Sequence, residues 1–409
     1  MRRRNETATP RRRNGERDDA KPLPEPGPGP RGVSPEYLGR FVAGGRLVDD
    51  MRDLSRWSGE EVAADDRIYF DGPRSLRYEA RGRVALTGDY SDDPIDLSDA
   101  TLSFAAYFHE PDDVEPTLYV TALAPDRDNW IRFEHPYLGL KNAGWQRFDV
   151  APTRTKGSPD LSDVRALVLS MNPGDRLVRF WLDDVRAHPR PDRGKLIFRF
   201  DDTHEHHYTE YFPVLREYGY PAIEAVVLNH VGRPSRLSGL QLRELSNAGW
   251  DLCYHTTAHQ NVTELSADEL AADVAEMDMF FRKIAGERAD VMVYPYGAYD
   301  GRSMDALAEH FDLAFGGGAP TNYALTNPMC VGSKGVDGDL AGAKELVDLA
   351  AEYRSLSVPL FHHFDPAAFE ELVEHVRRRE RAGEIDVLTA TDLREYLGSL
   401  DRWGRARDS

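Results

Sequence analysis

Two carboxylates and two imidazoles stand out because each pair directly follows an apolar stretch of chain. Asp201 and Asp202 come after the run LIFRF, and His255 and His259 come after the run WDLCY. Adjacent carboxylates repel each other, so a bound cation would stabilise one and leave the other available as a base. Two imidazoles four residues apart would share one face of a helical turn and could chelate one ion. With one carboxylate they form a two-His, one-carboxylate set whose open coordination positions indicate a hydrolytic metal site.

Two more strand ends carry residues suited to hydrolysis. Pro295, Tyr296 and Gly297 follow the run DVMVY, and a backbone N–H in this segment could face a developing oxyanion. His362 and His363 follow the run SVPLF. One of them could act as a general acid, because histidine titrates near neutral pH. Adjacent side chains at a strand end point in opposite directions, so we expect the other to be structural.

Each pattern also has a simpler explanation. The aspartate pair could be an exposed acidic turn that caps the next helix, and among 13 histidines a four-residue spacing can arise by chance. Pro295-Tyr296-Gly297 could be an ordinary turn. Three further histidines follow the aspartates: His204, His206 and His207. They could line the cleft, but we expect most of them to be solvated residues of a loop or helix start. The hypothesis of a metal site depends on four strand ends taken together.

These residues must be positioned by the elements that precede them. From Leu196 onward, apolar runs alternate with helical segments, which is typical of βα units that form a parallel sheet. The expected strands are residues 196–200, 222–228, 250–254, 290–294, 312–316, 357–361 and 385–389. The expected helices are residues 208–219, 238–249, 267–286, 302–310, 340–354 and a segment from Pro366. This many units favour a barrel over residues 195–405, with the C-terminal ends of its strands at one mouth.

The first half of the chain has a different rhythm. Residues 1–40 alternate charge with Pro and Gly, which predicts a disordered tail. Residues 41–190 contain short alternating strands with turns between them, which predicts an antiparallel β-sandwich or jelly roll. The expected strands are residues 75–80, 83–88, 100–108, 117–124, 129–135, 146–150, 164–172 and 177–187. The fold class is therefore α/β, with a barrel preceded by a β-sandwich.

Charge and composition limit the partners. The net charge of −19 argues against nucleic acid, whose phosphates this surface would repel. No apolar run approaches the roughly 18 residues of a transmembrane segment. Because the start also lacks the apolar region of a secretory signal, we expect a cytoplasmic protein, with an extracellular or cell-surface location as the alternative. An acidic surface poor in lysine indicates a halophilic source. No pattern indicates an oligomeric state.

The motifs resemble those of the polysaccharide deacetylase family (the NodB-homology group, carbohydrate esterase family 4). FRFDDTHEHHYTEYFPVLREYGYPA is similar to the family's opening strand, aspartate pair and helix. YHTTAHQNVTELS resembles its His-x-x-x-His metal motif, VYPYGAYD its third motif, and VPLFHHF its last strand. The resemblance covers roughly residues 195–395 with the motifs in the family's order.

The resemblance implies a distorted seven-stranded (β/α) barrel and a divalent cation, usually zinc. It also implies an enzyme that hydrolyses acetyl groups on a carbohydrate polymer or glycan, with an N-acetylhexosamine favoured. In the family's terms, Asp201 becomes the catalytic base. Asp202, His255 and His259 become the metal ligands.

The remaining motifs imply further roles. The amide of Tyr296 joins the oxyanion hole, and Pro295-Tyr296-Gly297 forms part of the substrate site. His362 becomes the general acid, because the segment Leu360-Phe361-His362 fits the spacing of the family motif better than a segment that ends at His363. The form Tyr-Pro-Tyr-Gly resembles the branch that acts on poly-N-acetylglucosamine.

Two positions depart from the family pattern. Thr203 stands where a glycine usually follows the aspartates, and Val293 stands where many members have an arginine that orients the catalytic aspartate. These departures favour one alternative, a noncatalytic carbohydrate-binding protein on the same scaffold. A second alternative keeps the metal site but hydrolyses a C–N amide bond outside glycans.

The first half resembles a galactose-binding-like sandwich of the kind attached to glycan enzymes. Three tryptophans, Trp130, Trp145 and Trp181, could stack on sugar rings. Because large aromatic side chains also fill cores, we expect at least two of them to serve packing.

Overall fold

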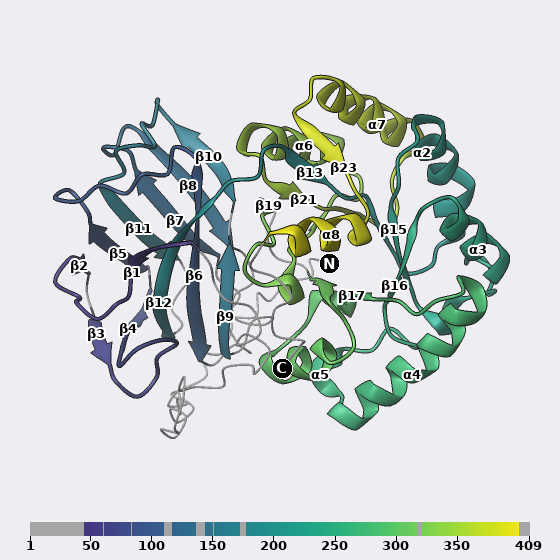
Figure 1. Ribbon diagram of the computed structural model, residues 1–409, viewed down its shortest axis with the longest axis horizontal. Helices are drawn as coiled ribbons and strands as arrows, with labels where there is room; N and C mark the ends of the chain where they lie inside the picture. The colour runs from purple at the N-terminus through teal and green to yellow at the C-terminus, as the bar shows by residue number, and fades with distance from the viewer. Residues whose placement is uncertain are drawn as a thin grey trace, which may run out of the picture.

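The computed structural model describes residues 45–59, 61–82, 84–109, 117–135, 144–149, 151–171, 177–316 and 321–400. The tail predicted for residues 1–40 lies outside these ranges. A sheet-rich part, coloured purple to blue, stands beside an α/β part, coloured teal to yellow (Figure 1). None of the helices in these ranges has both the length and the apolar character that crossing a bilayer requires.

Two six-stranded antiparallel sheets make up the N-terminal part. The first has the order β3 (Val62–Asp65), β4 (Ser75–Arg81), β12 (Leu177–Pro189), β6 (Ala100–His109) and β9 (Gly144–Asp149), with β1 (Arg46–Asp49) paired to β12. The second has the order β10 (Pro152–Lys156), β8 (Trp130–His135), β7 (Leu118–Leu123), β11 (Ala166–Met171), β5 (Val84–Asp89) and β2 (Trp57–Ser58). Every expected strand of this half is present. The unexpected β1, β2, β3 and β10 are short and lack a run of buried apolar residues.

Side chains from both sheets meet in one hydrophobic cluster. Its members include Leu76, Phe104 and Phe180 from the first sheet and Val120 and Leu169 from the second. Along β11 every second residue is buried, as the two-residue period of a strand requires. The two sheets therefore bury their facing surfaces against each other.

The tryptophans of this half serve mainly the core. Trp145 and Trp181 are fully buried, and each ring lies against Tyr107, with centroid distances of 5.7 and 5.2 Å. Trp130 is half-buried, and the guanidinium of Arg132 lies 4.8 Å from its ring. Neither fully buried ring is available to stack on a sugar.

The α/β part is built on a curved seven-stranded sheet in which every pairing is parallel. Its order is β18 (Leu313–Phe315), β17 (Val291–Val293), β16 (Asp251–Tyr254), β15 (Ile223–Val226), β14 (Arg199–Asp201), β22 (Pro359–Phe361) and β20 (Lys334–Gly335). The helices are α2 (Phe212–Tyr218), α3 (Gly239–Asn247), α4 (Ala267–Ile284), α5 (Gly301–Ala308), α6 (Leu340–Tyr353), α7 (Pro366–Arg381) and α8 (Ala390–Ser399). Helices α2, α3 and α4 line the outer side of this sheet in Figure 1. The predicted alternation of strands and helices is confirmed, except that α8 and the two-residue strand β20 were not expected and the strand expected at residues 385–389 lies outside this sheet.

The first predicted strand of this part, residues 196–200, is divided between two sheets. β13 (Gly194–Leu196) joins a four-stranded sheet with β19 (Thr321–Asn322), β21 (Leu356–Ser357) and β23 (Ile385–Val387). Three residues later, β14 pairs with β15 and β22 in the seven-stranded sheet. The run LIFRF is apolar almost throughout because all five residues are buried, but the strands that its backbone pairs with change midway. This change of partners is the distortion of the α/β part.

Helix starts follow the local sequence. Ser238 caps α3 and Ser266 caps α4, each within a reciprocal capping box with Gln241 or Glu269 three residues on. The helix expected from residue 208 instead begins with a π-helical turn at His207–Tyr211 before α2. That turn begins five residues after Asp202.

Candidate active site

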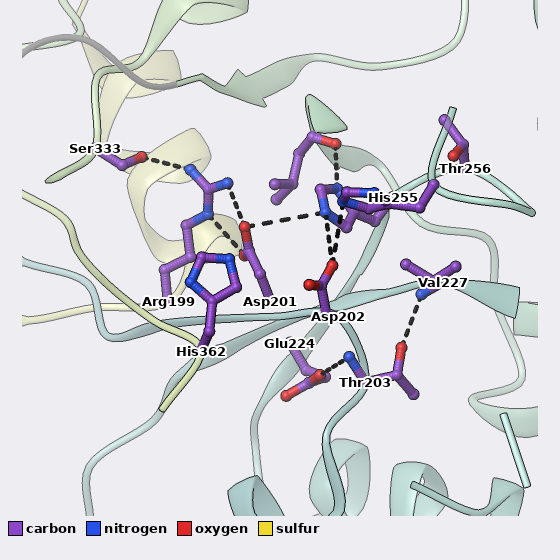
Figure 2. Close-up of polar contacts among 12 residues, drawn as sticks. Arg199, Asp201, Asp202, Thr203, Glu224, Val227, His255, Thr256, Ser333 and His362 are labelled. Atoms are coloured by element: carbon purple, nitrogen blue, oxygen red, sulfur yellow. Dashed lines mark hydrogen bonds and ion pairs between the residues drawn. The ribbon is translucent and has the colours of Figure 1, made fainter. Parts of the chain in front are cut away.

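Two strand ends of the seven-stranded sheet bring the predicted metal-ligating residues together. Asp201 and Asp202 lie at the end of β14, and His255 and His259 lie in the loop after β16. The Nε2 atoms of His255 and His259 lie 3.6 and 3.2 Å from Oδ1 of Asp202 (Figure 2). One ligand atom from each of these three residues lies within 4.8 Å of the others. The predicted convergence is therefore present in the structure.

The two histidines are not on a helical turn, and this part of the sequence interpretation is wrong. Residues 255–261 form an irregular loop, in which Thr256 and His259 have φ angles of 61° and 56°. Asp273 of α4 fixes this loop by accepting hydrogen bonds from the amide and hydroxyl of Thr257. It also accepts one from the Tyr254 hydroxyl at 2.5 Å. A buried carboxylate, rather than helical periodicity, sets the spacing of the two imidazoles.

The residues present fit a divalent cation. Oδ1 of Asp202 is buried and, among the described residues, has no hydrogen-bond donor, so it presents an unsatisfied acceptor to the site. Nδ1 of His255 lies 2.7 Å from the carbonyl oxygen of Val293, which makes Nδ1 the donor and leaves the Nε2 lone pair for an ion. Burial lowers the pKa of His259, so its ring is neutral at pH 7 and can also ligate. Val293, at one departure from the family pattern, thus orients a histidine through its backbone.

Arg199 is a residue of the candidate site that the sequence interpretation missed. Its guanidinium donates to both carboxylate oxygens of Asp201, with Nε–Oδ1 and Nη2–Oδ2 distances of 2.9 and 2.6 Å. Nη1 is held by the carbonyl of Gly316 and the hydroxyl of Ser333, 117 and 134 residues away in sequence. Burial alone would raise the pKa of Asp201, but the ion pair with Arg199 and the nearby His255 and His362 together outweigh it and lower that pKa. The two aspartates therefore coexist without requiring a cation to relieve all of their repulsion.

The signal for Arg199 was its place in the sequence. It is the one charged residue in the otherwise apolar run LIFRF, and it is almost fully buried. A buried arginine needs a partner, and its guanidinium fork matches a carboxylate. It takes the orienting role that the family usually gives to an arginine at the position of Val293.

Thr203 adopts the backbone conformation that explains why glycine is usual there. Its φ is 62°, and that of Asp202 is 75°, both in the left-handed region that favours glycine. Three hydrogen bonds hold Thr203 in place. Its amide donates to Oε1 of Glu224 at 3.1 Å, and its hydroxyl accepts from the Val227 amide at 2.8 Å (Figure 2). Its carbonyl accepts from the Leu237 amide at 2.9 Å. The surroundings compensate the strain that a side chain brings here.

A buried Glu–His pair lies beneath the aspartates, which corrects the expectation of a mostly solvated histidine cluster. His207 is fully buried, and its Nδ1 lies 2.9 Å from Oε2 of Glu224. Burial raises the pKa of Glu224 well above its usual value and lowers the pKa of His207 to about 3, so the imidazole is neutral at pH 7. His204 and His206 are half-buried. Glu224 was overlooked although it interrupts another apolar strand.

The two histidines after β22 separate as predicted. Nδ1 of His362 lies 2.9 Å from Oδ2 of Asp337, and its ring lies beside Arg199 and Asp201 (Figure 2). The hydrogen bond to Asp337 raises the pKa of His362 above its ordinary value. His363 instead approaches His204, with ring centroids 4.6 Å apart. Asp337 had no local signal, since it lies 25 residues before His362 in the sequence.

The third motif forms a tight turn beside the histidines. Pro295–Gly297 is a short 3-10 turn after β17, and Tyr296 has a left-handed φ of 59°. Tyr296 is 64% exposed as a residue, and its ring centroid lies 4.5 Å from that of His259. An exposed aromatic ring directly beside a candidate metal ligand is available to a substrate.

Two solved structures align with about half of this chain. The Xyl-CE4 domain of a multidomain xylanase from the hindgut metagenome of Trinervitermes trinervoides is 15% identical, with a TM-score of 0.38, and the alignment covers 51% of this chain and 92% of that one. A family 4 acetyl xylan esterase from Clostridium thermocellum, solved with a cobalt ion, is 17% identical, with a TM-score of 0.38, and the alignment covers 50% and 92%.

Sequence comparison identifies the family directly. The profile of the polysaccharide deacetylase family matches residues 188–311. The Bacillus subtilis (strain 168) protein YxkH, whose name provisionally describes it as a polysaccharide deacetylase, is 23% identical over 117 residues, which are 29% of this chain and 42% of YxkH. This chain therefore spans less than half of that relative's length. The resemblance read from the motifs is confirmed: across residues 188–311 the chain carries a domain of the polysaccharide deacetylase family.

Proposed function

We propose that this protein is a metal-dependent hydrolase that removes acetyl groups from a carbohydrate polymer or glycan, with N-acetylhexosamine units favoured. The observation that carries the proposal is the meeting of Asp202, His255 and His259 beside an ion-paired Asp201. The family match supports an enzyme that deacetylates carbohydrates. The acetylated glycan is the proposed partner.

Asp202, His255 and His259 are the proposed ligands of a divalent cation, with zinc favoured by two imidazoles and one carboxylate. When bound, such a cation supplies a Lewis acid that polarises the acetyl carbonyl and lowers the pKa of water. Of the two aspartates, Asp202 has the unsatisfied oxygen, whereas both oxygens of Asp201 are engaged by Arg199. This difference supports separate roles for the pair.

Asp201 is the proposed general base. Its lowered pKa keeps it ionised at neutral pH, and its Oδ2 lies 4.0 Å from Nε2 of His255, at the edge of the ligand set. As water attacks the acetyl carbon, its proton passes to Asp201. Arg199 holds the carboxylate in one orientation throughout, because both hydrogen bonds of the guanidinium fork must break before it can rotate.

His362 is the proposed general acid. Because Nδ1 is hydrogen-bonded to Asp337, Nε2 is free to donate a proton to the leaving nitrogen or oxygen as its bond to the acetyl carbon breaks. The acetyl group leaves as acetate. Asp337 thus keeps His362 protonated, while Arg199 keeps Asp201 ionised, so acid and base hold opposite protonation states at one pH.

Tyr296 is proposed to contribute twice. Its amide, in the left-handed turn of Pro295–Gly297, is the candidate donor to the oxyanion that forms on the acetyl oxygen. Its exposed ring offers an apolar face against which a sugar ring can stack.

The direct test is acetate release. The purified full-length chain, loaded with zinc, is incubated with N-acetylglucosamine oligomers, acetylated xylan and a panel of linear and cyclic amides. We expect acetate from a carbohydrate substrate, loss of the activity after chelation and recovery on addition of zinc. Release only from the non-glycan amides would favour the alternative hydrolase, and no release from any substrate by metal-loaded protein would support a noncatalytic binding role.

We expect Asp337→Asn to narrow the pH range of activity from the alkaline side. The introduced asparagine can still accept the amides of His362 and His363 through its Oδ1, but the substitution removes the charge that raises the pKa of His362. A general acid works only while protonated, so lowering its pKa moves the alkaline limb of the kcat–pH profile to lower pH. The acid limb should stay in place.

The matched control is Asp365→Asn. Asp365 lies three residues after His362 but caps α7 rather than bonding the imidazole, and asparagine keeps that cap. The alkaline limb of the kcat–pH profile of Asp365→Asn should coincide with that of the wild type. An alkaline limb that stays unchanged in Asp337→Asn would contradict the assignment of His362 as the acid.

Two sequence features, Thr203 and Val293, favoured a noncatalytic protein, but the structure supports that alternative less than the sequence did. Thr203 is held by three hydrogen bonds, and Arg199 occupies the orienting role that Val293 cannot fill. For the two N-terminal sheets we propose a galactose-binding-like sandwich. Of its three tryptophans, only Trp130 is not fully buried and remains a candidate for sugar stacking.

A further inference from the structure

A second group of three histidines lies outside the proposed catalytic set. His204 and His206 follow the aspartate pair, and His363 follows β22. One ring nitrogen from each lies within 4.8 Å of the others. The ring centroids are 4.6 Å apart for His204–His363, 4.7 Å for His206–His363 and 5.1 Å for His204–His206. The His255–His259 pair of the first site has a centroid distance of 4.8 Å, so the two groups are equally compact.

The cluster is anchored from both of its chain segments. Nε2 of His206 lies 2.6 Å from the carbonyl oxygen of His362, so Nε2 is the donor and the neutral ring keeps a lone pair on Nδ1. The amide of His363 is held by Oδ1 of Asp337 at 3.0 Å. The backbone of His204 forms a bridge with Arg236. A ligating histidine whose other nitrogen donates to a carbonyl is the usual arrangement at metal sites.

The ligand chemistry points to one class of ion. Three imidazoles and no carboxylate suit zinc and similar borderline cations and leave a fourth position for water. At zinc–nitrogen bonds of about 2 Å, the nitrogens of a tetrahedral site lie about 3.3 Å apart, so the rings need to close by at most about 1.5 Å. His204 and His206 are half-buried and His363 is exposed, so an ion can reach them.

We propose that His204, His206 and His363 form a second site for a zinc-class cation, distinct from the set of Asp202, His255 and His259. An ion held there joins the loop after β14 to the loop after β22. The first loop directly follows Asp201 and the second carries His362, so the ion fixes the backbone next to the proposed base and acid. Binding of the ion does not depend on the proposed deacetylation.

The test is zinc stoichiometry in the full-length chain, purified without a polyhistidine tag. Apo-protein is prepared by chelation, titrated with zinc and analysed for bound metal after gel filtration. We expect two zinc ions per chain in the wild type and one in the double variant His204→Gln/His363→Gln. We also expect one in His255→Gln/His259→Gln, which retains the second cluster, and none when all four histidines are replaced.

A histidine remote from both clusters provides the matched control. His310 precedes β18, at the opposite end of the sheet from the site, so His310→Gln should retain two zinc ions. Circular dichroism of each apo-variant verifies its fold. Zinc should raise the melting temperature of His255→Gln/His259→Gln, and this shift should disappear in the fourfold variant.

The outcomes separate this proposal from the proposed function. One zinc ion in the wild type, with none in His255→Gln/His259→Gln, would overturn the second site and leave the first intact. One zinc ion in both proteins would instead support the second site and contradict the first. Two zinc ions retained by His204→Gln/His363→Gln would also overturn the proposal.

Discussion

Asp201→Asn is expected to lower turnover by about 100- to 10,000-fold, the range that a positioned general base contributes. Asparagine fills the same space and can still accept from Arg199, but it cannot take the proton from water at neutral pH. The content of bound zinc should stay that of the wild type, because neither oxygen of Asp201 belongs to the proposed ligand set. Acetate release and bound metal, measured on the same preparation, check both halves of the expectation.

The substitution also leaves the guanidinium of Arg199 without its anionic partner. Arg199 is 2% exposed, so we expect a fall in melting temperature as well as in turnover. Asp339→Asn is the control, because Asp339 is an exposed cap of α6 that asparagine can replace. It should match the wild type in activity. An Asp201→Asn protein with near-normal turnover would remove Asp201 from the mechanism.

His255→Ala should lose both turnover and the cation at the first site. A Lewis acid contributes several kcal/mol to such a hydrolysis, which corresponds to a loss of at least about 1,000-fold. The zinc content should fall by one ion per chain relative to the wild type. His255 is almost fully buried and donates to the carbonyl of Val293, so alanine also leaves a cavity and an unsatisfied acceptor.

A second variant separates ligation from packing. His255→Gln keeps most of the volume, so it should stay closer to the wild type in stability while losing metal and turnover like His255→Ala. If His255→Gln kept the wild-type zinc content and turnover, His255 would not be a ligand. Unchanged activity in His255→Ala would refute the whole hydrolytic site.

Several residues at and beside the candidate site have strained backbone conformations. Asp202, Thr203, Thr256, His259 and Tyr296 all have φ angles between 56° and 75°. Such conformations cost about 1–3 kcal/mol each outside glycine and persist only where the surroundings impose them. Around Thr203 the surroundings are its hydrogen bonds with Glu224, Val227 and Leu237. These left-handed residues lie in the three loops that surround the proposed metal ligands.

The sequence by itself predicted most residues of the candidate site and the strand ends at which they lie. Asp201, Asp202, His255 and His362 each follow an apolar run, and such runs form buried parallel strands whose C-terminal ends share one edge. That inference needs only hydrophobic patterning, which is local. The alternation of strands and helices and the two capped starts at Ser238 and Ser266 followed from local patterns in the same way.

Only the tertiary structure decided how those residues are held. Arg199 could be recognised as an anomaly in its strand, but its bonds to Gly316 and Ser333 join segments 117 and 134 residues apart. The partnership of Asp337 with His362 and the irregular loop fixed by Asp273 are likewise contacts between separate elements. The pKa of each group depends on these neighbours and on burial, and neither exists until the chain has folded. Local sequence therefore indicated the type and order of the reactive groups, whereas their orientation and protonation state arise from packing.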